Sequence, residues 1–183
     1  MSKNLSTKVI VRAAVLMALS VIMTRFLGVM VPLAGMQAKR IAFGFVPLMM
    51  AGYLFGPIIG GIVGLGADII GVMMNPMGQF HPGFMVSSML TGLLPGLVML
   101  AIGGNNQHGK KKLYGLWIST ALVTIVIHIF LNNLWLKDIF HTGYLVLLPL
   151  RLPLAVVEGI VGGVIFVLLM KIMERIDPRG VSV

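Results

Sequence analysis

Residues 40–84 read RIAFGFVPLMMAGYLFGPIIGGIVGLGADIIGVMMNPMGQFHPGF, and this stretch decides the fold of the chain. It contains two apolar stretches of helix length that meet at Gly56-Pro57. Arg40 stands before the first stretch, Asp68 lies within the second, and prolines and aromatic rings follow in residues 75–84. The pattern predicts a membrane hairpin of two helices with a polar mouth, and we expect the function to lie at that mouth.

The composition of the whole chain indicates an integral membrane protein. Of 183 residues, 58% are hydrophobic and 10% are charged, with a mean hydropathy of +1.02. A soluble domain is roughly half apolar and about a quarter charged. The chain has no cysteine, which excludes disulfides and thiolate metal sites. The net charge of +9 is scattered between apolar stretches, so we do not expect a nucleic-acid partner.

The apolar runs predict an all-α membrane protein, a compact bundle of six transmembrane helices in a single domain over residues 1–183. The expected spans are residues 9–29, 41–55, 57–74, 83–103, 115–136 and 145–173. Six spans place both termini on one side of the membrane. Most of the 14 Lys and Arg residues fall on that side, which predicts that the termini are cytoplasmic.

The remaining basic residues cluster at the opposite, external mouth, where short loops are usually poor in Lys and Arg. They are Arg25, Lys39, Arg40, Lys137 and Arg151. Individual side chains could reach phospholipid headgroups. As a group, Arg25, Arg40 and Arg151 predict an anionic partner.

Amide and aromatic side chains are expected at the same mouth. Asn132, Asn133 and Trp135 end the fifth span, and Phe80, His81 and Phe84 open the fourth. Amides supply paired donors and acceptors for a heteroaromatic edge, and aromatic rings supply stacking faces. A belt of aromatic residues at the membrane interface would explain Trp135 almost as well. Together with the arginines, the set matches a planar polar ring that carries carboxylates.

Other motifs do not indicate an enzyme or a cofactor. Residues 104–111 resemble a phosphate-binding loop, but Lys111 stands where the magnesium-binding hydroxyl should be. Any ATP must therefore be hydrolysed by a partner. His81, His128 and His141 lie in different segments, so we expect no metal site. Asp68 and Glu158 are expected to be buried in structural pairs, with Glu158 about 10 Å from Arg151 along its helix.

Ala14 and Ala18 form a small-xxx-small element in the first span. Such an element packs against another helix, either within this protein or on a partner. The spacing alone favours neither packing within this protein nor packing on a partner.

At this point the sequence resembles the substrate-binding S-components of energy-coupling factor (ECF) vitamin transporters, most closely the folate-specific members. The resemblance covers nearly the whole chain. It is carried by Ala14-x-x-x-Ala18, Arg25-Phe26, residues 40–47, Phe55-Gly56-Pro57 with Gly60-Gly61 and Asp68, and residues 80–84.

The resemblance implies a bundle in the bacterial cytoplasmic membrane that binds its vitamin from outside. The bundle would then dock on a membrane scaffold subunit driven by two ATPases, topple and release the vitamin inside. Ala14 and Ala18 would form the docking surface, and the loops at residues 29–39 and 75–82 would gate the site. The chain itself would need no cofactor.

Folate fits the residues at the mouth. Its glutamate carboxylates would meet Arg25, Arg40 and Arg151, because Arg binds carboxylates in a bidentate manner. Its pterin would stack on Phe80, Phe84 and Trp135 near His81, and Asn132 or Asn133 would bind the pterin edge.

Several alternatives stay open. The ligand could be another vitamin or precursor, such as hydroxymethylpyrimidine, pantothenate or a deazaguanine precursor of queuosine. The chain could also be an assembly subunit of a membrane complex, a membrane enzyme or an autonomous transporter.

Overall fold

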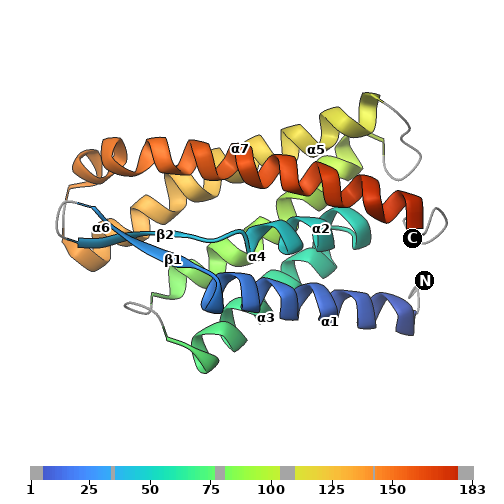
Figure 1. Cartoon of the computed structure of the whole chain (residues 1–183), viewed down its shortest axis with the longest axis horizontal. Helices are drawn as coiled ribbons and strands as arrows, with labels where there is room; N and C mark the ends of the chain where they lie inside the picture. The colour runs from blue at the N-terminus through green and yellow to red at the C-terminus, as the bar shows by residue number, and fades with distance from the viewer. Residues whose placement is uncertain (1–5, 34–35, 77–80, 104–109, 142, 177–183) are drawn as a thin grey trace.

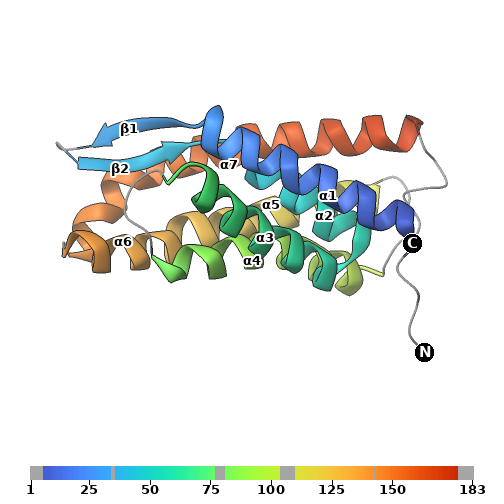
Figure 2. The same ribbon diagram turned by 90° about the horizontal axis from the view of Figure 1, so that it is seen from below.

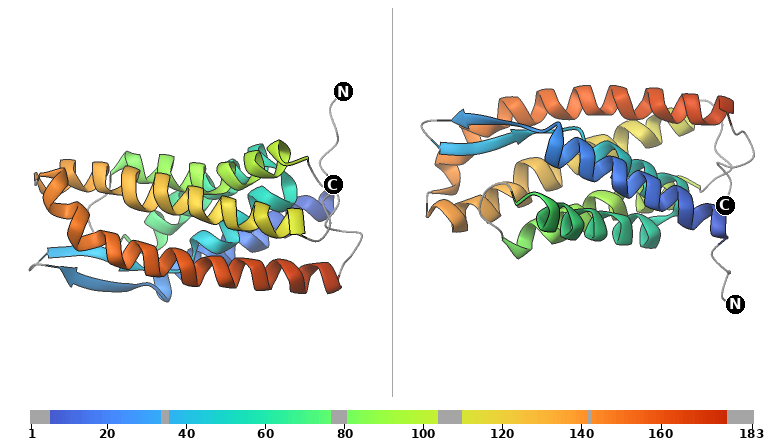
Figure 3. Two further views of the ribbon diagram at one scale, coloured as in Figure 1. Left: turned by 90° about the horizontal axis from the view of Figure 1, so that it is seen from above. Right: turned by 60° about the horizontal axis from the view of Figure 1, so that its bottom comes forward.

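The structure is a computed structural model that describes residues 6–33, 36–76, 81–103, 110–141 and 143–176. Its helices lie roughly along one long axis (Figure 1). The start of α1 and the end of α7 lie at the same end of the molecule, while the two strands lie toward the other end (Figures 1 and 3). The elements, in order, are α1 (Thr7–Val21), η1 (Ile22–Phe26), β1 (Val29–Leu33), β2 (Met36–Ile41), α2 (Phe45–Phe55), α3 (Pro57–Met74), α4 (Pro82–Ala101), α5 (Lys110–Val123), η3 (Thr124–Leu131), α6 (Asn132–Phe140) and α7 (Tyr144–Ile176).

Five of the described helical segments are long and apolar enough to cross a membrane. They are Thr7–Phe26, Pro57–Met74, Pro82–Ala101, Lys110–Ile139 and Arg151–Arg175. Large apolar side chains such as Ile58, Met73 and Leu145 are exposed on the outside of the bundle. Outward-facing apolar side chains suit a lipid environment, so the prediction of a multi-pass helical membrane protein is confirmed in this form.

Helix α2 is the sixth apolar helix, and it is shorter than predicted. It has 11 residues, all of them buried. At 1.5 Å per residue it covers roughly half of a bilayer core of about 30 Å. It contacts α1, α3, α4 and α7, so its neighbours shield it from lipid. The predicted span 41–55 therefore starts too early, because residue 41 ends a strand and the helix begins at Phe45.

The junction between α2 and α3 is where the sequence predicted it. Helix α2 ends at Phe55, Gly56 has φ of +92°, and α3 begins at Pro57. A positive φ just past a helix end favours glycine, and proline is well suited to the first helical position.

Three glycines let α2, α3 and α4 approach backbone to backbone. A Cβ atom on Gly52, Gly60 or Gly92 would lie closer than 3.0 Å to backbone atoms of the facing helix, a separation that real Cβ atoms essentially never show. Small residues allow this approach between membrane helices. The crossing holds α4, which carries part of the site described below, against the buried α2.

A β-hairpin replaces the predicted loop at residues 29–39, so the expectation of helices alone was wrong. Strands β1 and β2 pair antiparallel, with Met30 opposite Arg40 and an irregularity between Val31 and Leu33. Strand β2 contacts α7, and the hairpin lies beside the first part of α7 (Figure 2). Because β1 and β2 pair with each other, their backbone N–H and C=O groups gain hydrogen-bond partners that an unpaired loop would lack. The first helical segment ends at Phe26, before the predicted end of the first span at residue 29.

Two helical segments widen into π-helical turns, η1 and η3. Arg25 lies in η1 and His128 in η3, and both side chains line the same cavity. Such turns are frequent at functional sites, because the extra residue redirects a side chain.

Candidate functional site

A cavity of about 410 Å³ is enclosed by the hairpin, η1, η3 and helices α1, α2, α3, α4, α6 and α7. Its volume is in the range of small-molecule sites. The charged residues on its wall are Arg25, Arg40, Asp68, Arg151 and Glu158. The structure thus brings together the three arginines that the sequence selected, from η1, β2 and α7, and adds two carboxylates.

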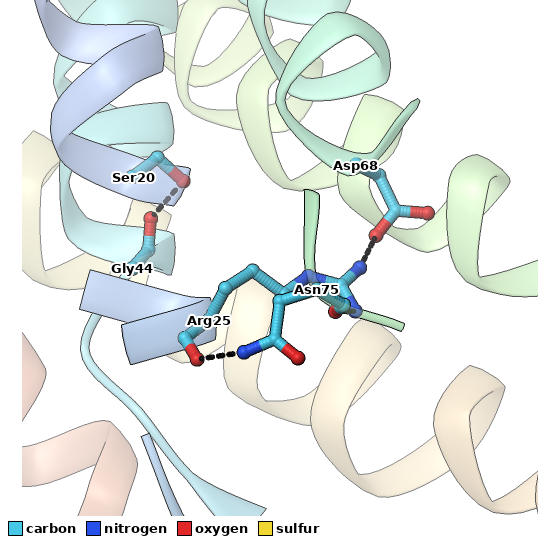
Figure 4. A network of polar contacts seen from close by, with 5 residues as sticks. All are labelled: Ser20, Arg25, Gly44, Asp68 and Asn75. Atoms are coloured by element: carbon cyan, nitrogen blue, oxygen red, sulfur yellow. Dashed lines mark hydrogen bonds and ion pairs between the residues drawn. The ribbon is translucent and has the colours of Figure 1, made fainter. Parts of the chain in front are cut away.

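Arg25 is tied to α3. Its Nη2 donates to Oδ1 of Asp68 at 3.0 Å, and its Nη1 donates to the carbonyl of Asn75 at 3.4 Å (Figure 4). The Asn75 amide in turn donates to the Arg25 carbonyl at 3.1 Å. Gly71 makes room for this, since a Cβ there would lie 2.7 Å from Arg25 Nε. The charge of Arg25 is therefore already balanced by Asp68.

A second contact holds α1 to the start of α2. Ser20 Oγ donates to the carbonyl of Gly44 at 2.7 Å, deep in the same region (Figure 4). Both residues lie on the cavity wall. This contact fixes the segment that follows the hairpin.

Arg40 lies on the same wall of the cavity, near both Arg25 and Asp68. Burial lowers the pKa of Arg40, the nearby charge of Arg25 lowers it further, and Asp68 raises it. The guanidinium groups of Arg25 and Arg40 thus lie near one carboxylate, that of Asp68. An anion bound beside Arg40 would relieve the repulsion between the two arginines, so the electrostatics favour an anionic ligand here.

Arg151 is oriented by Asn133. Arg151 Nη1 donates to Asn133 Oδ1, and Asn133 Nδ2 donates to the Ile129 carbonyl at 2.7 Å. Asn133 is buried and does not line the cavity, whereas Asn132 does. Asn132 Oδ1 and Arg151 Nε are buried without a hydrogen-bond partner among the described residues. Of the two predicted amides, Asn132 therefore faces the ligand space and Asn133 supports Arg151.

The predicted aromatic residues form a small cluster. His81 stacks on Trp135 with ring centroids 5.5 Å apart, and Phe84 meets His81 edge to face at 6.3 Å. Trp135 Nε1 donates to Ser87 Oγ at 3.0 Å. His81 and Phe84 line the cavity, whereas Trp135 lies behind His81. Phe80 lies outside the described residues.

His81 has a second role at the start of α4. Its Nδ1 accepts a hydrogen bond from the Gly83 backbone amide at 3.0 Å and so caps the helix. A Cβ atom on Gly83 would overlap the Trp135 ring, so glycine leaves room for the indole. The cap and the stack together fix the orientation of the imidazole.

Glu158 and His128 line the cavity, although the sequence analysis did not count them among the ligand-binding residues and expected Glu158 to be buried in a structural pair. Glu158 Oε1 accepts from the Ala42 backbone amide at 3.0 Å, and Oε2 lies 4.0 Å from His128 Nδ1. His128 meets Phe45 edge to face at 5.0 Å. The signal that could have found Glu158 is its place within an apolar span, where an ionisable residue is a functional candidate by default.

Ala14 and Ala18 are exposed on the outer side of α1. Their neighbours Val11 and Val15 are also exposed, at 56% and 60%. This face is not used for packing inside the described part of the chain. Its use in docking stays a prediction.

No group of three or more His, Asp or Glu residues that could hold a metal ion occurs among the described residues. The polar groups of the cavity are instead guanidinium, carboxyl, amide, imidazole and hydroxyl groups. This set can bind a small molecule that has both charged and polar aromatic parts.

Comparisons with known proteins agree with this arrangement. The model of one family, described as ECF-type riboflavin transporter, S component, matches residues 4–175. A curated relative named folate transporter FolT, from Clostridium novyi (strain NT), is 27% identical over 92% of this chain and 91% of its own. Another of the same name, from Leuconostoc mesenteroides, is 26% identical over 77% of this chain and 70% of its own.

Two solved structures share the fold. One is a crystal structure of FolT bound with folic acid, with a TM-score of 0.71 and 25% identity over 90% of this chain and 93% of the other. The second is the S component of a bacterial ECF transporter, with a TM-score of 0.71 and 27% identity over 94% and 98% of the two chains. Because the family model matches nearly the whole chain, the chain belongs to the family of S components of ECF-type transporters.

Proposed function

We propose that this chain is the folate-binding S component of an ECF transporter and that the cavity is its folate site. The observation that carries the proposal is the set of three arginines that line one cavity together with an amide and aromatic rings. Folate combines a polar aromatic ring system with two carboxylates. The two relatives named folate transporter FolT and the FolT structure with folic acid support the same ligand.

Riboflavin is the main competitor, because the family model carries its name. Riboflavin has no carboxylate, so it would leave the arginines of the cavity without an anionic ligand. Pantothenate has one carboxylate but no aromatic ring for His81 and Phe84. Hydroxymethylpyrimidine and a queuosine precursor, like riboflavin, lack carboxylates.

In this proposal, Arg40 and Arg151 bind the ligand carboxylates, and Arg25 completes the positive group with its charge shared by Asp68. Phe84 and His81 contact the ring system, and Asn132 binds a polar edge. Asn133 acts through Arg151, and Trp135 acts through His81. Phe80, which lies outside the described residues, stays a prediction from the sequence as a stacking residue.

The proposal includes the membrane arrangement predicted from the sequence. The chain crosses the bacterial cytoplasmic membrane six times, with cytoplasmic termini and the cavity open to the outside. An ECF scaffold subunit and two ATPases complete the transporter, and the chain needs no cofactor of its own. Ala14 and Ala18 form the docking surface, after which the bundle topples and releases folate inside.

Binding of tritiated folate to the purified chain tests the ligand. Arg40→Ala should weaken binding roughly 10- to 150-fold, the equivalent of one hydrogen bond to a charged group. Lys137→Ala is the matched control, because Lys137 is also basic but is exposed and away from the cavity. Excess riboflavin or pantothenate should not compete. Displacement by riboflavin with no folate binding would refute the assignment, and no vitamin binding at all would favour an assembly subunit.

The docking surface is tested separately. Ala14→Leu with Ala18→Leu should leave folate binding unchanged, because both positions are exposed on the outer side of α1. The same pair should abolish folate uptake by cells that express the complete transporter. Normal uptake by the variant would remove these residues from the docking surface.

A further inference from the structure

A basic surface lies far from the cavity, at the end of the molecule where α1 begins and α7 ends. The first turn of α5 and the last turns of α7 meet there, because Lys112 on α5 forms an ion pair with Glu174 on α7 (Figure 3). Among the described residues of these turns, five are basic and one, Glu174, is acidic, so the net charge is +4. The five basic residues, which we call the terminal basic surface, are Lys110, Lys111, Lys112, Lys171 and Arg175.

The stability of α5 does not account for its three lysines. They occupy the first turn of the helix, which holds no acidic residue. The start of a helix carries a partial positive charge, so cations there are unfavourable. Glu174 balances the charge of Lys112, whereas Lys110 and Lys111 are exposed. Their placement therefore favours an anionic partner from outside the chain.

Two exposed aromatic side chains follow the lysines on α5. Tyr114 and Trp117 come four and seven residues after Lys110, the spacing that places side chains on one face of a helix. Tyr114 is 65% exposed and Trp117 is 39% exposed. Trp117 also contacts α7, because a Cβ atom on Gly163 would lie 3.0 Å from its ring. Tyr and Trp are enriched where lipid headgroups meet acyl chains, so Lys110, one turn nearer the end of the molecule, lies at the level of the headgroups.

Helix α7 combines basic and apolar side chains in the same way. Leu168, Lys171, Ile172 and Arg175 are spaced by one helical turn or less and are all exposed. Long basic side chains can lay their alkyl part on apolar surface while the charged group reaches the headgroups. The end of α7 thus offers cationic groups beside a surface suited to acyl chains.

We propose that the terminal basic surface binds the headgroup of an anionic phospholipid, with the acyl chains against the apolar side chains of α5 and α7. Basic side chains gathered between membrane helices are suited to anionic headgroups, and each Lys or Arg near an anionic membrane surface strengthens binding about 5-fold. In the membrane arrangement proposed above, this lipid belongs to the cytoplasmic leaflet. The lipid site goes beyond the proposed function and does not depend on which vitamin the cavity binds.

An acidic surface of a partner protein is the alternative occupant. The exposed side chains next to the basic ones favour a lipid, because Tyr114, Leu168 and Ile172 are apolar over most of their surface. A phospholipid meets both parts of this surface at once, with its phosphate at the basic groups and its chains at the apolar ones.

Native mass spectrometry of the purified chain, titrated with dioleoyl phosphatidylglycerol or dioleoyl phosphatidylcholine, tests the proposal. The two lipids share their acyl chains and differ in the net charge of the headgroup. The wild type should bind phosphatidylglycerol at least about 10-fold more tightly. Lys110→Gln with Lys171→Gln should weaken binding of phosphatidylglycerol roughly 30-fold, about 5-fold for each charge, and leave binding of phosphatidylcholine unchanged.

The matched control is Lys8→Gln with Lys137→Gln, which removes the same charge from exposed positions on α1 and α6. It should change binding of phosphatidylglycerol by less than about twofold, because salt screens exposed charges that lie farther from the lipid. An equal loss in the control and the test variant would reveal an effect of net charge alone and overturn the site. The melting temperature of each variant in detergent checks that it folds.

The remaining outcomes identify the occupant. Equal affinity of the wild type for the two lipids would overturn the proposal. Inorganic phosphate at the same concentrations should not displace phosphatidylglycerol, because it has no acyl chains, and displacement would overturn the role of the apolar side chains. If the wild type shows no lipid preference and the test variant instead fails to copurify with the scaffold and ATPase subunits, the surface is a protein contact. None of these measurements uses folate, so their failure leaves the proposed ligand of the cavity standing.

Discussion

The ion pair between Arg25 and Asp68 makes a strong prediction about stability. The pair joins η1 to α3 across 3.0 Å, with side-chain exposures of 8% and 12%. Replacing Asp68 alone leaves the buried guanidinium group of Arg25 without its ion-pair partner, and replacing Arg25 alone leaves Asp68 with Arg40 as its nearby positive charge. Replacing both, with Arg25→Met and Asp68→Leu, leaves two apolar side chains of similar shape.

Breaking a buried pair by removing one partner costs about 3–5 kcal/mol, whereas replacing both partners is often nearly neutral. We expect the lower end, about 3 kcal/mol, for each single variant, because both side chains border a cavity. For a chain of this length, 1 kcal/mol shifts Tm by about 2–4 °C. Each single variant should therefore lose about 6–12 °C, and the double variant should be more stable than either.

The assay is thermal unfolding of the ligand-free protein in detergent, followed by tryptophan fluorescence. Ligand must be absent, because a bound anion could replace Asp68 as the partner of Arg25. Lys137→Ala again serves as the control for loss of a basic residue, since its side chain is exposed. If the destabilisation of the double variant equals the sum of the two single effects, the two residues are not coupled, and the reasoning is refuted.

Two further predictions concern the framework of the site. Gly92→Ala should cost about 3 kcal/mol or prevent folding, because the added Cβ would overlap the Gly60 backbone. Gly61→Ala, whose nearest contact would be at 3.6 Å, should change stability by less than about 1 kcal/mol. Equal melting temperatures of the two variants would contradict the close crossing. Trp135→Phe should lower Tm by about 2–4 °C through loss of the bond to Ser87, and adding Ser87→Ala to it should change little more; independent effects of these two substitutions would show that the bond is not present.

The sequence predicted the helices well because a membrane imposes a simple requirement on composition. Each long apolar run became a helix, and Gly56-Pro57 became the junction between α2 and α3. The hairpin was missed for an equally physical reason. Strand β1 contains Pro32, which argues against a strand, and its partner strand is recognised only once the register is known.

The candidate site was predicted in its residue types but not in its internal contacts. Arg25, Arg40 and Arg151 do line one cavity. The sequence could not show that Arg25 is already paired, because Asp68 is 43 residues away along the chain. It also could not show that Asn132 lines the cavity whereas Asn133 binds Arg151, because this depends on the rotation of helix α6 about its own axis. Contacts between distant segments are thus the part that composition and spacing do not determine.

The two faces of the α1–η1 segment connect ligand binding to docking in the proposed function. Its inner side carries Ser20 and Arg25 on the cavity wall, and its outer side exposes Ala14 and Ala18. A ligand anion that draws Arg25 away from Asp68 alters the contact that holds this segment to α3. Any effect of folate on docking must then be matched by an equal effect of docking on folate affinity, because coupling between two binding sites is reciprocal. If binding of the scaffold to the outer face of α1 weakens folate binding, the folate-loaded protein must bind the scaffold less tightly than the empty protein does. The exception is a cycle in which ATP hydrolysis by the partner subunits supplies the difference.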